Sequence, residues 1–232
     1  MKYFIGIILI MIACPASADD NYIFIEQSGS NLTLKIDQIG NDQEITMLNQ
    51  NSYFTGNYWN VHLHQQGSRN NTINLHELSG NDNTIRFGQG ASLSDSSDTS
   101  FYYDGYEYGE NSATFELYGN DNTVVGYQVS NDGSGAGNGH TYNLHIAGSD
   151  NEVWTEQKHD GTKSIDLTIY NSDNTATIKQ RGNNQTHTAN VTLDGIYGTN
   201  FTLIQNGSTN NSYTISQDCY TVGGCSLSVT QD

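Results

Sequence analysis

Asn21-Tyr-Ile-Phe-Ile-Glu-Gln27 is the first of several units that begin with asparagine, end with glutamine and carry mostly apolar residues at alternate positions between them. This alternation predicts a β-strand with one buried face, because successive strand side chains point to opposite faces. An amide at each end of the buried face, repeated along the chain, predicts a unit that stacks on copies of itself. The further units are Asn83–Gln89, Asn122–Gln128, Asn151–Gln157, Asn174–Gln180 and Asn211–Gln217.

Other glutamines mark the exits of predicted strands, each followed two residues later by glycine. They are Gln38, Gln65 and Gln205, and Gln231 ends the last predicted strand. Glycine permits the positive φ angles that reverse a chain, so the Gln-x-Gly pattern predicts a turn directly after an inward glutamine. Clusters of Gly, Asn and Asp such as Gly80–Asn83 predict the remaining turns.

The spacing of the units predicts an all-β fold, a parallel β-solenoid of stacked strand-turn-strand repeats. Uninterrupted units recur every 11 to 13 residues, which predicts about 16 short strands arranged in about 8 rungs. At the cross-β spacing of about 4.8 Å, eight rungs form a stack about 38 Å long. Inward Asn and Gln side chains would then form amide ladders along the stack, which satisfies donors and acceptors that burial would otherwise leave unpaired.

The N-terminus has the pattern of a secretory signal peptide, predicted to occupy residues 1–18. Lys2 precedes an apolar run, and Ala16-Ser-Ala18 forms a cleavage site. The pattern also leaves open a lipoprotein reading, in which Cys14 would carry the lipid. Residues 19–232 are predicted to form the repeat solenoid.

Two insertions interrupt the repeats near residues 90–110, which are rich in Tyr, Ser and Asp, and 129–139, which are rich in Gly and Ser. Insertions in a solenoid map to loops on one side of the stack. The first is either a contact surface or a flexible loop.

Charge and cysteine content restrict the partners and cofactors. The net charge of −17 argues against binding nucleic acid or anionic lipid through charge. Cys219 and Cys225 lie close together near the C-terminus, and in an exported protein they are expected to form a disulfide loop. No cofactor and no resident metal are predicted.

Catalysis is not expected, because basic residues are few and acidic residues are scattered through turns. His62, His64 and His76 have weak metal-ligand spacing, and a solvated polar face is the favoured interpretation. The Gly80–Asn83 turn and its copies are similar to calcium-binding β-roll turns, although ordinary turn chemistry also accounts for them. Outward threonines such as Thr175 and Thr177 are too few to predict an ice-binding face.

The inward Asn and Gln positions, the alternating strands, the Gln-x-Gly exits and the signal peptide together resemble the curlin family, whose members are subunits of curli, a bacterial extracellular functional amyloid. The resemblance covers residues 21–231. It implies a cell-surface fibre that grows by templated strand stacking and supports adhesion and biofilm matrix. Its implied partners are further copies of the chain, a curli-type nucleator subunit and an outer-membrane secretion channel. The alternative is a monomeric secreted β-solenoid that acts as an adhesin or calcium-dependent binding module.

Overall fold

The computed structural model of the chain describes residues 22–23, 33–40, 43–46, 60–67, 71–78, 80–98, 100–103, 111–129, 140–158, 162–181, 187–206 and 211–232. The predicted signal peptide, Asn21, Gln27 and most of the 129–139 insertion lie outside these ranges. The described residues contain no helix that is long and apolar enough to cross a membrane.

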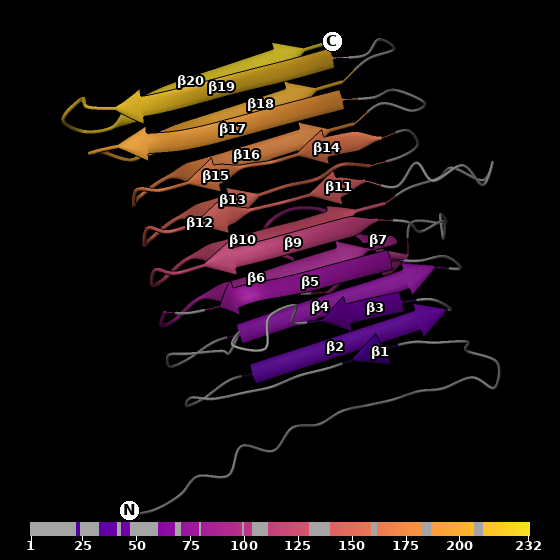
Figure 1. Cartoon of the computed structure of the whole chain (residues 1–232). Helices are drawn as coiled ribbons and strands as arrows, with labels where there is room; N and C mark the ends of the chain where they lie inside the picture. The colour runs from indigo at the N-terminus through magenta and orange to yellow at the C-terminus, as the bar shows by residue number, and fades with distance from the viewer. Residues whose placement is uncertain are drawn as a thin grey trace, which may run out of the picture.

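The fold is a parallel β-solenoid, as predicted, in which two sheets face each other across one core (Figure 1). Sheet I has eight strands in the order β2 (Thr33–Gly40), β4 (Asn60–Gly67), β6 (Thr84–Gln89), β10 (Thr123–Gln128), β13 (Glu152–Trp154), β16 (Thr175–Gln180), β18 (Thr199–Gln205) and β20 (Cys225–Gln231).

Sheet II stacks the intervening strands in the same direction, from the N-terminal to the C-terminal end of the solenoid (Figure 1). It contains β1 (Tyr22–Ile23), β3 (Gln43–Thr46), β5 (Asn71–Leu78), β9 (Ser112–Leu117), β11 (Thr141–Tyr142), β12 (His145–Ile146), β14 (Lys163–Ile165), β15 (Thr168–Ile169), β17 (His187–Gly195) and β19 (Asn211–Cys219).

Twenty strands are present in the described part of the chain, against about sixteen predicted. Two levels of sheet II are each broken into two short strands, β11 with β12 and β14 with β15. The other two additional strands, β7 (Ala91–Ser92) and β8 (Tyr102–Tyr103), form an antiparallel hairpin inside the first predicted insertion. Each sheet therefore has the eight levels that the repeat spacing predicted.

The core consists of columns of apolar side chains that run along the stack. In sheet I the strand register aligns Val61 with Ile85, Ile85 with Val124 and Val124 with Val153, and all four are fully buried. Neighbouring rungs shield each such side chain from above and below. The last rung has a neighbour on one side only, and its inward residues are partly buried: Tyr213, Ile215, Leu227 and Val229.

Four similar corners connect strands of sheet II to the following strands of sheet I. Asp82, Asp121, Asp150 and Asp173 occupy the same place in them, each with a positive φ between 55° and 61°. This left-handed conformation is tolerated by Asp better than by most residues. Backbones of successive corners touch, and a Cβ atom added at Gly119 would overlap the Gly148 carbonyl.

The first insertion packs against the outer face of sheet I over its described part. Leu93 and Phe101 belong to a small apolar cluster with Val125, Tyr127 and Trp154. The Arg86 guanidinium donates a hydrogen bond of 2.8 Å to the Ser96 carbonyl and another to the Asp98 carbonyl. This segment is therefore docked on the solenoid.

Candidate functional site

The first candidate element is a column of glutamines at the ends of the strands of sheet I. Gln38 donates from Nε2 to Oε1 of Gln65 at 2.9 Å, and Gln65 donates to Gln89 at 2.9 Å in the same way. Gln89 continues the series to Gln128 at 3.1 Å. The four amides thus form a hydrogen-bonded ladder with a single direction, in which each donor points towards the C-terminal end of the stack.

These glutamines also connect the two sheets. Gln65 Nε2 donates to the Asn71 carbonyl at 3.1 Å, and Gln89 Nε2 donates to the Thr72 carbonyl at 3.2 Å. Both carbonyls belong to β5 of sheet II. Each amide therefore closes one edge of the core and ties its own rung to the next, which makes burial of a polar side chain favourable.

The glutamine ladder changes direction in the middle of the stack. Gln180 donates backwards to Oε1 of Gln157 at 2.8 Å, while Gln205 donates forwards to Gln231 at 2.7 Å. Gln157 has a φ of 98°, and its own Nε2 donates to the Thr141 carbonyl at 2.8 Å. As a result Nε2 of Gln128 is buried without a hydrogen-bond partner among the described residues.

The second element is a column of asparagines at the opposite edge of the core. Oδ1 of Asn83 accepts from the backbone N–H of Asn122 at 2.9 Å, and Oδ1 of Asn122 accepts from the N–H of Asn151 at 3.0 Å. Asn151 accepts from Asn174 at 2.9 Å, and Asn174 accepts from the N–H of Thr199 at 2.7 Å. Each asparagine side chain therefore holds the backbone of the rung that follows it.

Replacing one member of this column should destabilise the solenoid. We expect Asn122→Ala to lower the free energy of unfolding by about 1–3 kcal/mol, because it leaves the buried N–H of Asn151 and the Gly148 carbonyl without their partner. Unfolding in guanidinium measures the change. The control is Asn200→Ala, because Asn200 is an exposed residue of β18. Equal unfolding midpoints for the two variants would contradict the assigned role.

The remaining predicted amides lie in sheet II and not in these two columns. Asn211 pairs with His187 of β17, and Gln217 pairs with Leu193. The motif Asn211–Gln217 thus has the same spacing as the sheet I units but occupies the other sheet. Gln217 Nε2 donates to the Asp218 carbonyl at 3.2 Å and does not continue the glutamine ladder.

A third column lies at the starts of the sheet II strands, and of its members only Asn211, which follows His187, belongs to the sequence-based prediction. Asn71 donates to Oε1 of Gln43 at 2.9 Å, and Asn111 donates to Oδ1 of Asn71 at 3.0 Å. Oδ1 of Asn111 in turn accepts from the backbone of His140 at 3.0 Å. Beyond His140 the column continues with ionisable side chains, Lys163 and then His187, and all three are fully buried.

Burial affects the protonation of His187 in this column and of two histidines on sheet I. Burial lowers the pKa of His187, and the charge of Lys163 lowers it further, while a backbone hydrogen bond with Arg181 acts in the opposite direction. On the outer face of sheet I, burial lowers the pKa of His62 to about 4. Burial also lowers the pKa of His64, although Asp37 partly offsets the effect.

Acid should therefore destabilise the solenoid. A histidine whose pKa is lower in the folded than in the unfolded state contributes stability above its unfolded pKa of about 6.5, and this stability is lost as the pH falls towards the folded value. We expect the guanidinium concentration at the unfolding midpoint to decrease as the pH is lowered from 7.5 to 5. His187→Asn, which places an amide in the column, should reduce the fall. An identical pH dependence in this variant would show that His187 does not contribute.

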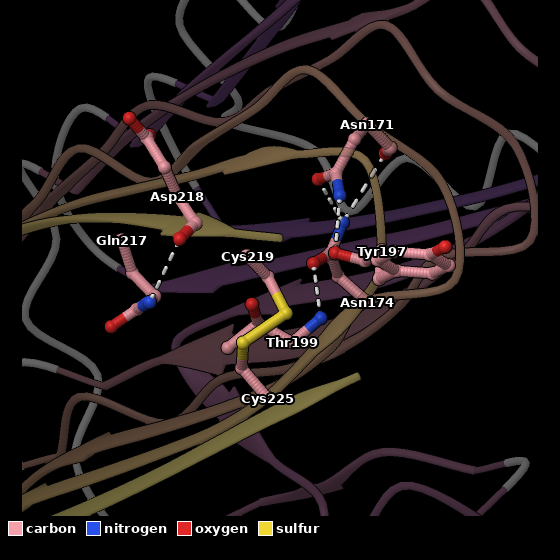
Figure 2. Close-up of a disulfide and its surroundings, with 8 residues drawn as sticks. All are labelled: Asn171, Asn174, Tyr197, Thr199, Gln217, Asp218, Cys219 and Cys225. Atoms are coloured by element: carbon pink, nitrogen blue, oxygen red, sulfur yellow. Dashed lines mark hydrogen bonds between the residues drawn. A yellow bond between two sulfur atoms is a disulfide. The ribbon is translucent and has the colours of Figure 1, made fainter. Parts of the chain in front are cut away.

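The last corner of the stack carries a disulfide. Cys219, at the end of β19, is fully buried and bonded to Cys225, at the start of β20, with Cα atoms 5.8 Å apart. Figure 2 shows this bond beside Asn174, the last residue of the asparagine column, and Thr199, whose N–H donates to Asn174. The disulfide joins the terminal strands of the two sheets.

No family model, curated protein or solved structure matches the chain. Within the described ranges, no group of three or more His, Cys, Asp or Glu side chains is placed to hold a metal ion. The features with the clearest chemical organisation are the amide columns and the two ends at which they stop.

Proposed function

We propose that the chain is the structural subunit of an extracellular, curli-like amyloid fibre that grows by templated β-strand stacking and supports surface adhesion and biofilm matrix. The signal-peptide pattern predicted at the N-terminus and the curlin-like repeats support this assignment. The observation that carries it is the complementarity of the two ends of the glutamine ladder.

At the N-terminal end, Oε1 of Gln38 is a buried acceptor with no donor among the described residues. At the C-terminal end, Gln231 accepts from Gln205, and its own Nε2 makes a long hydrogen bond of 3.4 Å to the Ser212 carbonyl. A second copy stacked on the last rung could accept from Gln231 through its Gln38, after stacking has uncovered the Oε1 atom that is buried in the free subunit. This contact would repeat the donor direction found from Gln38 to Gln128.

The last rung also has the properties of a template. Strands β19 and β20 are nine and seven residues long and contain no proline, and every second residue of β20 is exposed. Edge strands of this kind offer unpaired backbone groups to an incoming chain. Stacking a further rung would bury the partly exposed inward side chains Tyr213, Ile215, Leu227 and Val229.

Seeded assembly tests the proposal. Residues 19–232 are diluted from denaturant and followed by thioflavin T fluorescence, with and without sonicated seeds, and the products are examined by electron microscopy. The proposal expects a lag that seeds shorten, and fibres at the end. A stable, β-rich monomer would overturn it and favour a secreted adhesin or calcium-dependent binding module.

A further inference from the structure

The interior corners of the solenoid depend on the rung that follows them. Nδ2 of Asn83 donates to the Gly119 carbonyl at 2.8 Å, and Nδ2 of Asn122 donates to the Gly148 carbonyl at 2.9 Å. In both cases the acceptor lies in the next corner along the stack. The side-chain amide of such an asparagine therefore makes all of these hydrogen bonds only when another rung covers its corner.

The last two corners contain no such asparagine. The strand register places Thr199 and then Cys225 after the asparagine column, and Cys225 is bonded to the buried Cys219 (Figure 2). A covalent bond within one rung needs no following neighbour. The sequence thus changes from asparagines whose partners lie in the next rung of the same chain, through Thr199, to a disulfide at the C-terminal corner, which no further rung of the free subunit covers.

We propose that the Cys219–Cys225 disulfide is a redox switch that holds the C-terminal rung as a preformed template for the next subunit. This inference rests on the proposed function and adds a regulator to it. The disulfide fixes the end of β19 to the start of β20, so both exposed edges are presented in register. Without it, ordering the rung and binding the incoming chain must occur together, and ordering is entropically unfavourable.

The exchange chemistry is simple. Oxidation removes two protons and two electrons from the two thiols and passes them to an external disulfide, which is reduced to two thiols. In the reverse direction, an external thiolate is expected to attack the sulfur of Cys225, because Cys225 is partly exposed whereas Cys219 is fully buried. A second thiolate then resolves the mixed disulfide, leaving both cysteines reduced.

The test compares seeded elongation of residues 19–232 in the oxidised form, in dithiothreitol, and as a Cys219→Ser/Cys225→Ser double variant. Each monomer is added to seeds of its own form, at equal seed mass. We expect elongation to slow about tenfold after reduction and in the double variant, and dithiothreitol to leave the double variant unchanged. Hydrogen exchange on soluble monomers should show lost protection in β19 and β20 after reduction, with protection retained in β16.

Elongation of the reduced chain at the oxidised rate would overturn the switch and leave the proposed function intact. So would unchanged protection of β19 and β20. If the oxidised chain forms no fibres under any condition, the proposed function is overturned, and the switch with it.

Discussion

A chain carrying Gln231→Lys is expected to elongate fibres at least about tenfold more slowly than the natural chain. In the free subunit the lysine can extend into solvent, because the last rung is partly exposed. In the fibre the same side chain would be buried against Gln38 of the next copy, where an unpaired charge costs several kcal/mol. Each 1.4 kcal/mol corresponds to a factor of ten in affinity. Seeded thioflavin T kinetics measure the effect.

The matched control is Ser228→Lys, which adds the same charge to an exposed position of the same strand. It should elongate at close to the natural rate, because Ser228 points away from the core. Gln38→Lys should reproduce the defect at the other end. If the Gln231→Lys and Gln38→Lys variants both elongated at the rate of the natural chain, end-to-end continuation of the glutamine ladder would be excluded.

The second large effect is expected at the corners. Gly119→Ala should destabilise the solenoid by roughly 3 kcal/mol, because the added Cβ would overlap the Gly148 carbonyl and force neighbouring rungs apart. The carbonyl belongs to the backbone and the Cβ is bonded directly to it, so neither can move without disturbing the strand pairing of β10 with β13. The guanidinium midpoint of the monomer measures the loss.

Gly223→Ala is the control for this substitution. Its Cβ would have no neighbour within 4 Å, although its φ of 94° is unfavourable for alanine. A loss of about 1 kcal/mol is expected from that backbone strain alone. A Gly119→Ala variant as stable as Gly223→Ala would contradict close stacking of the corners.

The strands and the glutamine column could be predicted from the sequence because both are local patterns. Alternation fixes which residues point inward, and a glycine two residues after Gln38 or Gln65 marks the exit of the strand. Once the units are aligned, the positions of Gln89 and Gln128 follow by counting. The all-β solenoid was predicted on the same basis and is confirmed.

The sheet to which a unit belongs could not be predicted from its motif. Asn211–Gln217 has the same amide spacing as Asn174–Gln180, yet Gln217 pairs with Leu193 in sheet II, whereas Gln180 pairs with Gln205 in sheet I. A seven-residue pattern carries no information on which side of the core the strand lies. That information resides in the succession of turns, and Asn211 follows the strand exit at Gln205 by only six residues.

The column of His140, Lys163 and His187 was missed because its residues are chemically unlike the asparagines that precede them. A lysine is rarely buried, so composition favours an outward position for Lys163. Only the register of β11, β14 and β17 brings the three residues together. A signal was present: each stands at, or directly before, the first residue of a sheet II strand, as Asn71 and Asn111 do.

Electron cryomicroscopy of fibres grown from residues 19–232 tests the central claim most directly. The proposed assembly predicts a parallel β-solenoid that continues through the subunit boundary, with an axial repeat of about 38 Å for eight rungs. Gln231 of one copy should lie next to Gln38 of the following copy. Fibres with another subunit repeat, or with these two residues far apart, would contradict the account.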